Sequence, residues 1–578
     1  MGRHLARRGR WPRDPECSVR RCGFECVRED RLAVRLLAFG CCEPDRTAGG
    51  IVSKTVDVLI IGGGGSGLTA AISAATSGST ALVLEKCAQI GGSTAMSVGS
   101  FTAANTSYQY RAGVNDSIDL FIEDMKLANG GFEDRENKEL RRVLAENAGP
   151  TVEWLSSIGV QFLGPTPEPP YEKPRMHNVI PNSTAYATAL LRESRKRGVE
   201  IVTDARVDVL LKNAAGEVIG ARVGNAEYFG RRAVILATGD YSASTEMKSD
   251  FVSPAAAKVP PVNKNNTGDG LKLGADAGGV LLQMDRLYEG LRFFPSKRPD
   301  AIKILPSHPA LSRLMRAVAE KAPKIMALIA RGALTSWVAP NNTMYRAGAI
   351  LVDPTGNRVA NEDSDKELAR GVAAGANRAY LIFDEPLAET FSAWPNPVST
   401  FPGVAYAYVK DYKTYRPDVF FRADSIAELA DRTGIPAAAL EKTVSSWNAT
   451  VETQHDADFG RQHFGNGVRV GPFYALGPLG AFITLADGGL DVDTRLRVVD
   501  ASRNAIPGLF AAGSTGQGGL QLLNHGLHIG WAMISGRLAG RHAAQEPIRS
   551  DLEPVAGATS VLGRHLVPTL TGESSGTS

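Results

Sequence analysis

A run of glycines near residue 60 has the spacing that a diphosphate-binding turn needs. Gly62, Gly64 and Gly67 satisfy the pattern GxGxxG, and Glu85 stands at the end of the next apolar run. In such a turn the first glycine allows a tight bend, the second lets a diphosphate approach the backbone, and the third lets the following helix pack closely. The N–H groups of a helix beginning near Ser66 would bind the diphosphate, and Glu85 a ribose hydroxyl. These residues predict a dinucleotide site, because a glycine-rich turn without a ligand leaves Glu85 unexplained.

The elements that must hold this turn can be read on either side of it. VDVLII, from Val56, is a short, continuous and β-branched apolar run bounded by glycine, which predicts a buried parallel strand. A helix of small residues follows, and TALVLEK then predicts a second strand with Glu85 at its C-terminal end. Strand, turn, helix and strand together predict an α/β fold of the doubly wound kind.

Length and composition limit the class of protein. The chain has 578 residues, 43% of them hydrophobic and 22% charged, with a net charge of +3. This length is too great for one ordinary core, so two or more substructures are expected. The absence of a basic stripe interleaved with aromatics argues against nucleic-acid binding, and no apolar run is long enough to span a bilayer. The composition is typical of a cytoplasmic enzyme.

The first 51 residues differ from the rest of the chain and hold five of the six cysteines. A metal-binding knuckle, an export signal and a non-native extension are the competing interpretations. The cysteines lack the paired CxxC halves and histidines of a zinc site, so no metal is predicted. An arginine interrupts the apolar stretch after Arg20 and Arg21, which is unfavourable for an export signal. We expect translation to begin near Val52, residues 1–51 to be non-native or disordered, and Cys87 to be a packed thiol.

Three later motifs narrow the choice of dinucleotide. They are GGST at residues 91–94, ATG at residues 237–239, and the glycine-rich segment IPGLFAAGSTGQGGL, which leads on to Gly530. With these motifs, residues 55–545 resemble the superfamily of FAD-dependent fumarate reductases and 3-ketosteroid Δ1-dehydrogenases. The resemblance implies FAD as the cofactor. Covalent-flavin members carry a histidine beside the GGST turn, and this chain has none there, so non-covalent binding is expected.

The resemblance also implies which residues contact FAD. They lie in the first glycine turn, at the ribose-binding acid, in the GGST turn, at an adenine-binding backbone position, in the ATG turn and in the closing segment. The residues at these places are Gly62, Gly64, Gly65, Ser66, Gly67, Glu85, Lys86, Gly91, Gly92, Ser93, Thr94, Val207, Ala237, Thr238, Gly239, Gly513, Ser514, His528 and Ile529.

The long separation between the first and last motifs implies that a cap interrupts the nucleotide fold. We expect a discontinuous, Rossmann-like FAD-binding domain over residues 52–285 and 480–545. An inserted α+β capping domain should occupy residues 286–479, where loops lengthen and Pro and Trp become more frequent. The tail, residues 546–578, is rich in Ser, Thr, Gly and Pro and is expected to be flexible.

The positions that bind a dicarboxylate in fumarate reductases are not preserved. The resemblance places Leu485 at the substrate-binding histidine and Leu523 near the late arginine. It places Asn342 and Tyr345 at the Glu and Arg of the cap. Each charge-assisted hydrogen bond lost in this way is worth about 1.5 to 3 kcal/mol. Fumarate is therefore not the expected substrate.

The C-terminal segment resembles the steroid-dehydrogenase branch, although the catalytic tyrosines are not preserved. Gly526 matches the glycine whose N–H helps to polarise a ring ketone, whereas Leu522 replaces the tyrosine that shares this task. Lys366 stands where fumarate reductases have a proton-donating arginine. Hydride exchange with a flavin needs a protein acid or base and a donor to the carbonyl. The candidate catalytic residues are Lys366, Tyr345, Gly526, His525 and Tyr171.

Each side-chain candidate has a structural alternative. Lys366 is either a proton shuttle, if desolvation lowers its pKa toward neutrality, or a solvated surface lysine. Tyr345 either donates to the carbonyl or packs inside the cap. One of His525 and His528 is expected to meet the cofactor or substrate, and the other to be structural.

The expected function is FAD-dependent hydride transfer between flavin N5 and a CH–CH bond beside a carbonyl. The expected substrate is largely apolar, such as a steroid or cyclic ketone. The alternatives are a fumarate-reductase-like reductase of an enone or acid, a flavoprotein that uses FAD structurally as a lyase or isomerase, and a non-catalytic binding protein. The electron partner is a quinone or a soluble carrier.

Residues 308–337 have no recognised counterpart in the two enzyme groups. Apolar residues at helical spacing alternate there with Arg and Lys, which predicts a basic amphipathic helix. Such a helix either lies on an anionic membrane or packs on its own domain.

Overall fold

The computed structural model describes residues 53–566, except 130, 297–304, 323–330, 333, 337 and 402–404. The chain divides into two units, residues 1–50 and residues 51–578. The expected extension at 1–51, part of the expected amphipathic segment and the last residues of the tail lie outside the described residues.

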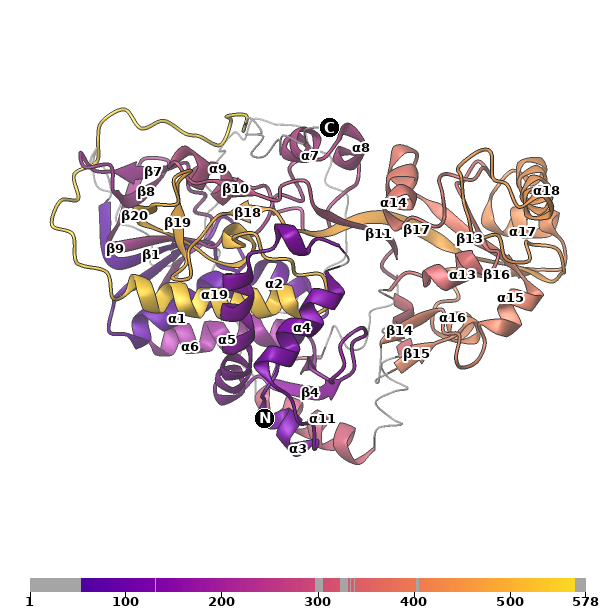
Figure 1. The fold of residues 1–578 in the computed structure, drawn as a ribbon, viewed down its shortest axis with the longest axis horizontal. Helices are drawn as coiled ribbons and strands as arrows, with labels where there is room; N and C mark the ends of the chain where they lie inside the picture. The colour runs from indigo at the N-terminus through magenta and orange to yellow at the C-terminus, as the bar shows by residue number, and fades with distance from the viewer. Residues whose placement is uncertain are drawn as a thin grey trace, which may run out of the picture. The chain divides into compact units, whose positions relative to one another are not determined.

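A mainly parallel sheet of eight strands organises the first group of elements (Figure 1). Its strand order is β19-β20-β9-β1-β2-β6, with β7 and β8 extending from β9, and β1 pairs in parallel with both β2 and β9. The strands are β1 (Ser53–Ile61), β2 (Ala81–Leu84), β6 (Glu200–Val202), β7 (Val209–Lys212), β8 (Val218–Val223), β9 (Ala226–Leu236), β19 (Arg497–Val499) and β20 (Ala505–Ala511). The strands predicted at VDVLII and TALVLEK are β1 and β2.

Helices from both ends of the chain pack beside this sheet. Helix α1 (Gly65–Thr76) contacts α19 (Leu527–Ala543) and α6 (Thr184–Lys196), and α19 also contacts α5 (Lys138–Ser157). Small residues make the contact of α1 with α19 close: a Cβ at Gly540 would lie 2.1 Å from the carbonyl oxygen of Ala70. The last helix therefore completes the core begun by the first strand.

Shorter elements surround this core. They are α2 (Gly92–Met96), α3 (Ser107–Arg111), α4 (Ile118–Ala128), η1 (Glu133–Arg135), α7 (Thr245–Phe251), α8 (Pro254–Ala257), α9 (Asp269–Asp276), β10 (Leu281–Leu282), β18 (Gly489–Leu490) and η2 (Gly513–Gly516). A three-stranded sheet with the order β3 (Ser100–Thr102), β5 (Met176–Ile180), β4 (Gln161–Thr166) also belongs here. Helix α11 (Pro309–Lys321) packs on β4 and β5.

A second, antiparallel sheet with its helices is called the cap here. Its strands are β11 (Leu287–Phe293), β12 (Ile350–Val352), β13 (Ala379–Asp384), β16 (Phe420–Ala423) and β17 (Phe473–Ala486), and the hairpin β14 (Ser399–Phe401) and β15 (Ala405–Ala407) lies apart. The long β17 pairs with β13 at its start and with β11 at its end (Figure 1). The predicted boundary at residue 480 falls inside β17.

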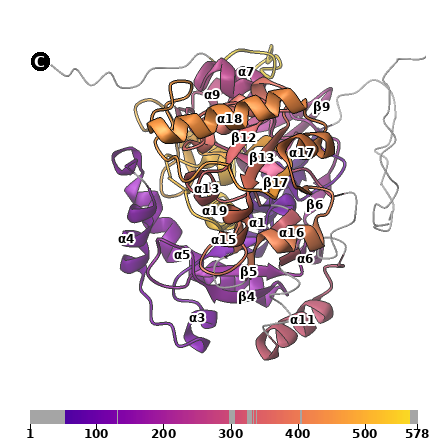
Figure 2. The same ribbon diagram turned by 90° about the vertical axis from the view of Figure 1, so that its right-hand side faces the viewer.

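Two apolar cores cover opposite faces of the cap sheet. On one face, Leu381, Phe383 and Leu476 pack with α13 (Asn342–Arg346), α14 (Asp365–Ala374), α15 (Glu385–Thr390) and α16 (Val409–Tyr415). On the other face, Ile382 and Ala475 pack with α17 (Ile426–Thr433) and α18 (Ala437–Thr453), as Figure 2 shows from the cap side. Alternate residues of a strand face opposite ways, so each strand contributes to both cores.

The segment after α19 has no helix or strand over residues 546–566. Val561 is buried, and the Val555 N–H donates to the carbonyl of Lys212 (2.9 Å) while the Val555 side chain is exposed. The flexibility expected for residues 546–578 stays a prediction. None of the helices in the described ranges is long and apolar enough to cross a bilayer.

Candidate active site

The first glycine turn is a tight cradle made of backbone. Gly62 has φ +109°, and a Cβ there would lie 2.3 Å from the carbonyl oxygen of Ala237. A Cβ at Gly67 would lie 1.8 Å from the carbonyl oxygen of Gly62. At Gly64, by contrast, a Cβ would meet no atom within 4 Å, and no side chain caps the start of α1. The open space and the uncapped N–H groups fit a diphosphate.

The acid predicted to bind a ribose is buried beside this turn. Glu85 accepts hydrogen bonds from the N–H groups of Gly63 (2.6 Å) and Cys87 (2.8 Å). Asp269 lies nearby, bonded to Lys86 (3.0 Å) and Arg206 (2.9 Å). Burial alone would raise the pKa of Asp269, but Arg206 and Lys86 together hold it below the ordinary value. The cleft between them is lined by Ile61, Gly62, Leu84, Glu85, Lys86, Ala205, Arg206, Val207, Thr238, Asp269 and Leu273.

The GGST turn lies directly against the first glycine turn. Gly91 donates its N–H to the carbonyl of Gly63 (2.9 Å) and forms a bridge with Gly64. Its φ of +116° lets α2 begin there without a side-chain cap. Ser93 accepts hydrogen bonds from Asn263 (2.8 Å) and Asn266 (3.1 Å). A Cβ at Gly65 would lie 2.5 Å from the hydroxyl of Thr94, so these two turns meet closely.

The ATG turn and the closing segment complete the cradle. The Thr238 N–H donates to the hydroxyl of Thr515 (2.9 Å), which donates to the carbonyl of Gly239 (3.0 Å). A Cβ at Gly513 would lie 2.7 Å from the Ser66 hydroxyl, and one at Gly489 would lie 2.6 Å from the Ser514 carbonyl oxygen. Ile529 is half-buried on the main core. The structure therefore gathers the motifs near residues 64, 92, 238 and 514 in one place.

A buried carboxylate joins the closing segment to the cap strands. Asp487, at the end of β17, accepts hydrogen bonds from Gln517 (2.7 Å) and Tyr288 (3.0 Å), and Arg286 Nε lies 3.6 Å away. His528 Nε2 is 3.2 Å from Asp487 Oδ1 and lacks hydrogen-bond geometry. Burial would raise the pKa of Asp487, but His528, Gln517 and Arg286 hold it below its ordinary value.

A second polar cluster lies at the start of α19. His525 Nδ1 is hydrogen-bonded to Glu168 Oε1, and the Thr102 hydroxyl donates to the His525 carbonyl (2.7 Å). The other oxygen of Glu168, the Tyr171 hydroxyl and the Asn524 amide nitrogen are buried and have no hydrogen bond of normal geometry among the described residues. Burial raises the pKa of Tyr171 far above its ordinary value. Buried polar atoms of this kind normally have partners, so the cluster fits a polar group of a ligand.

One face of β11 carries the side chains that meet these two clusters. The Tyr288 ring packs edge-on against His528, with 6.0 Å between ring centroids. The hydrogen bond to Glu168 raises the pKa of His525, and the nearby positive charge of Arg292 opposes part of that rise. Gly290 lies between Tyr288 and Arg292 in register with Phe482, and a Cβ there would meet no atom within 4 Å. Helices α17 and α18 cover one face of the cap sheet near β13. At Gly290 of β11, the same face of the sheet has open space. We call Tyr288, Gly290, Phe482, Asp487 and His525 the site wall.

Two of the sequence candidates for catalysis lie elsewhere in the cap. Tyr345 is buried in the first cap core, and its hydroxyl has no partner among the described residues. Lys366 is exposed in the first turn of α14. Helix α14 packs on the opposite face of β11, where Arg370 pairs with Glu289 (2.7 Å). The structure brings together Gly526, His525 and Tyr171 but not these two residues.

The positions aligned with dicarboxylate ligands are also dispersed. Leu485 lies in an irregular step of β17, where the pairing jumps from Ile483 to Ala486. Such bulges often redirect side chains next to active sites. Leu523 is half-buried in the loop before α19, and Asn342 begins α13.

Sequence reasoning missed Glu168, Tyr288 and Asp487 as parts of the site. Glu168 stands in PEPPYEKP, and an acid in a proline-rich loop near a candidate tyrosine was the available signal. Nothing local marks Tyr288 or Asp487, because each gains its role from partners in another part of the chain.

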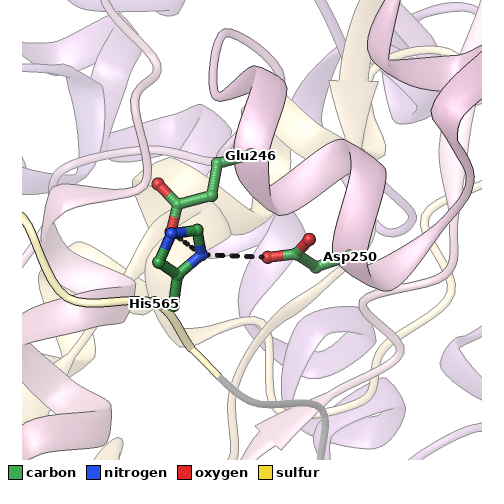
Figure 3. A group of neighbouring side chains, drawn as sticks. All are labelled: Glu246, Asp250 and His565. Carbon is green, nitrogen blue, oxygen red and sulfur yellow. Dashed lines mark ion pairs between the residues drawn. The ribbon is translucent and has the colours of Figure 1, made fainter.

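Glu246, Asp250 and His565 form a separate exposed group (Figure 3). His565 Nδ1 lies 3.1 Å from Glu246 and 3.6 Å from Asp250, and Lys272 also pairs with Glu246 (3.2 Å). Lys272 therefore balances Glu246, and the group resembles an ordinary cluster of surface polar side chains.

Comparison with known proteins identifies the chain as a member of an FAD-binding family. The profile of the family described as "FAD binding domain" matches residues 57–527. A fumarate reductase (cytochrome) from Shewanella frigidimarina is 28% identical over 504 residues, which cover 85% of this chain and 77% of that protein. A digoxin reductase from Eggerthella lenta is 26% identical over 537 residues, which cover 85% and 87%.

Solved structures share the fold. The open conformation of a flavocytochrome c3 fumarate reductase aligns with a TM-score of 0.64 and 24% identity, covering 86% of this chain and 79% of that one. A 3-ketosteroid-Δ4-(5α)-dehydrogenase from Rhodococcus jostii RHA1 aligns with a TM-score of 0.54 and 23% identity, covering 85% and 97%. The comparisons confirm the predicted resemblance, the α/β fold and FAD as the cofactor.

Proposed function

Because the chain belongs to the FAD binding domain family, we propose that it transfers hydride between FAD and a CH–CH bond beside a carbonyl in a neutral, largely apolar substrate. The general class, an FAD-dependent oxidoreductase of the fumarate reductase and steroid dehydrogenase superfamily, follows from family membership. The choice of substrate is the proposal. The names of two relatives, a fumarate reductase and a digoxin reductase, indicate how widely substrates differ among similar proteins.

The charge balance around the site wall carries this proposal. Two acids, Glu168 and Asp487, face two arginines, Arg286 and Arg292. The charges of these four side chains cancel, which leaves imidazoles in place of the arginines that a dianion would need, and leucines stand at two of its expected contacts. Phe482 and the open space at Gly290 instead suit an apolar ring. A neutral ketone loses far less than a dicarboxylate on entering such a site.

A backbone donor for the carbonyl is available at the start of α19. Gly526 has φ +81° and begins the helix without a side-chain cap. Its N–H has no acceptor within the described residues. A helix N-terminus favours negative charge, and a fixed N–H that meets developing charge on a carbonyl oxygen accelerates reaction. Gly526 is the proposed carbonyl-polarising residue.

Bound FAD supplies the hydride chemistry. The cradle glycines would hold its diphosphate, Glu85 a ribose, and the closing segment with His528 and Ile529 the flavin end. Lys366 stays a hypothesis for the proton shuttle. Lys366→Ala with unchanged FAD content tests it: a fully retained rate removes Lys366 from the mechanism.

Anaerobic flavin bleaching tests the substrate class. The reduced enzyme should be reoxidised by 2-cyclohexenone or 4-androstene-3,17-dione and not by fumarate, or the oxidised enzyme should be bleached by the matching saturated ketones. Reaction with fumarate alone would overturn the proposal. Absence of any flavin redox change with every donor and substrate would favour structural use of FAD.

A second candidate function, contact with an anionic membrane, is favoured by α3 and α11. The α3–α11 surface comprises Tyr110, Arg111, Arg313, Leu314, Val318 and Lys321. The amphipathic side chain of Tyr110 is 87% exposed, and the apolar side chain of Leu314 is 61% exposed. The guanidinium of Arg111 lies 4.7 Å from the Tyr108 ring centroid. Exposed apolar side chains among basic ones suit the anionic cytoplasmic leaflet, and a quinone there could accept electrons.

Vesicle co-sedimentation tests this contact. The protein should pellet at low salt with phosphatidylcholine vesicles that contain phosphatidylserine and not with phosphatidylcholine alone. Arg313→Glu should weaken pelleting, and Arg432→Glu, on the exposed face of α17, should leave it unchanged. No pelleting at low salt would overturn the proposal.

A further inference from the structure

We infer that Glu168 and His525 form a proton-transfer pair, in which His525 exchanges a proton with a substrate carbon and Glu168 positions the imidazole. This inference rests on the proposed function and names the acid or base that Lys366 and Tyr345 were expected to supply. Neither Glu168 nor its pairing with His525 is evident from the sequence.

The hydrogen bond fixes which imidazole nitrogen is available. Nδ1 of His525 faces Glu168 Oε1, and the Glu168 side chain is only 6% exposed. The acceptor is a buried carboxylate, so Nδ1 carries the hydrogen. The His525 side chain is 69% exposed, which leaves Nε2 open toward the space before the site wall. A histidine held in this way has one nitrogen for structure and the other for proton exchange.

The backbone places this nitrogen beside the carbonyl donor. His525 and Gly526 are consecutive, and the Thr102 hydroxyl holds the His525 carbonyl at 2.7 Å. A Cβ at Gly526 would lie 2.7 Å from the Thr102 N–H nitrogen, so β3 supports the whole turn. The N–H that would bind a carbonyl oxygen and the imidazole that would reach the neighbouring carbon therefore come from one rigid turn.

The charges that face His525 favour its protonated form. The hydrogen bond to Glu168 raises its pKa, and partial desolvation of the imidazole and the positive charge of Arg292 offset only part of this rise. The hydroxyl of Tyr171 and the amide of Asn524 are uncharged polar groups of the same cluster. A pKa near the working pH is what proton exchange requires.

The proton and electrons balance in both directions. In reduction of an enone, the hydride for the β-carbon would come from bound reduced FAD, and His525 Nε2 would give its proton to the α-carbon. The π electrons of the C=C bond form the new α C–H bond, and His525 is left neutral until solvent reprotonates it. In dehydrogenation, neutral His525 removes the α-proton.

The protonation half of the inference is tested by NMR of the holoenzyme with ¹³C-labelled histidine. His525→Gln assigns the signal, and the wild-type His525 pKa should lie above that of a free histidine. Glu168→Gln should lower it by about one unit, a tenfold loss of imidazolium at high pH. The matched control is Glu172→Gln, an exposed acid of the same loop paired with Lys173, which should leave the pKa unchanged. An unchanged His525 pKa in Glu168→Gln overturns the pair.

The catalytic half is tested without flavin chemistry. The oxidised holoenzyme in D₂O should exchange the α-hydrogens of cyclohexanone faster than buffer does. Loss of exchange in His525→Gln, with exchange and FAD content retained in His463→Gln, an exposed histidine of the cap, supports the assignment. Exchange that survives His525→Gln, or no exchange by the wild type, overturns it. Exchange needs no hydride transfer, so the proposed redox function can fail in the bleaching experiment while this test succeeds, and the reverse.

If Glu168→Gln does not fold, the His525 pKa of the wild type and the hydrogen exchange of His525→Gln still test the proposed pair. A wild-type His525 pKa at or below the ordinary value would by itself contradict the role assigned to Glu168.

Discussion

The nucleotide cradle and the site wall are built in different ways. The cradle is backbone: closely packed glycines at residues 62, 67, 91 and 513 set its shape, and one position, Gly64, is left open. The wall is made of side chains from loops and strands far apart in the chain, such as Glu168 and His525, which are separated by 357 positions. The cradle thus fixes the cofactor, and the wall is free to change with the substrate.

The largest effect on FAD binding is expected where the cradle is tightest. Gly67→Ala places a Cβ 1.8 Å from a carbonyl oxygen, so the turn must shift. We expect at least about a tenfold loss in FAD affinity and about 1 to 3 kcal/mol of lost stability. Flavin absorbance after gel filtration and denaturant unfolding of the apoprotein measure the two effects.

Gly64→Ala separates cofactor binding from folding. Its Cβ meets no protein atom, so the apoprotein should keep its stability while FAD affinity falls. Gly563→Ala, also with open space around it and without a positive φ, should keep both its stability and its FAD. Equal stability losses in Gly64→Ala and Gly67→Ala would show that the two positions do not differ as described.

Removing one residue of a buried charge network should destabilise the cap without changing FAD binding by the cradle. Arg461 is fully buried, donates to the carbonyl oxygens of Tyr345 and Ala349, and lies 3.3 Å from Glu362. Arg461→Met leaves Glu362 with Arg358 and the N–H of Leu351, removes the charged donor to two buried carbonyls, and should cost about 3 to 5 kcal/mol. We expect loss of turnover with FAD content nearly unchanged, measured by activity and flavin absorbance.

The control for the cap variant is the exposed pair of Arg432 and Glu428. Arg432→Met should change stability by less than about 0.5 kcal/mol. Loss of FAD from Arg461→Met would contradict the independence of the two regions.

A smaller effect on stability is expected from the protonation of a buried histidine, His177. His177 is fully buried between the Thr106 hydroxyl and the Phe101 carbonyl, and burial lowers its pKa to about 4. The unfolded chain binds a proton below about pH 6.5 while the folded chain does not, so stability falls as pH drops from about 6.5 to 4. The loss reaches about 3 kcal/mol.

His177→Gln should remove this pH slope, as measured by denaturant unfolding across the window. His463→Gln, at an exposed position, should leave the slope in place. An identical pH dependence of stability in the wild type and His177→Gln would contradict the buried neutral state of His177, because Glu136, whose pKa burial raises to about 7, contributes a slope of opposite sign to both proteins.

Sequence reasoning predicted the cradle because its signals are local. The strand, the glycine spacing and Glu85 lie within one short stretch, and the comparisons confirm the family and FAD. The wall could not be predicted in the same way. Lys366 and Tyr345 were chosen by alignment with motifs, but α14 packs on the far face of β11 and Tyr345 is enclosed by the cap core.

The missing side chain at position 290 has a consequence for selectivity. Gly290 has no left-handed backbone requirement and no neighbour around its Cβ position, so the fold does not need a glycine there. Under the proposed function, valine or leucine at residue 290 would narrow the entrance for bulky rings while small enones still pass. One codon would then set the upper limit of what this enzyme admits, without disturbing how it holds its flavin.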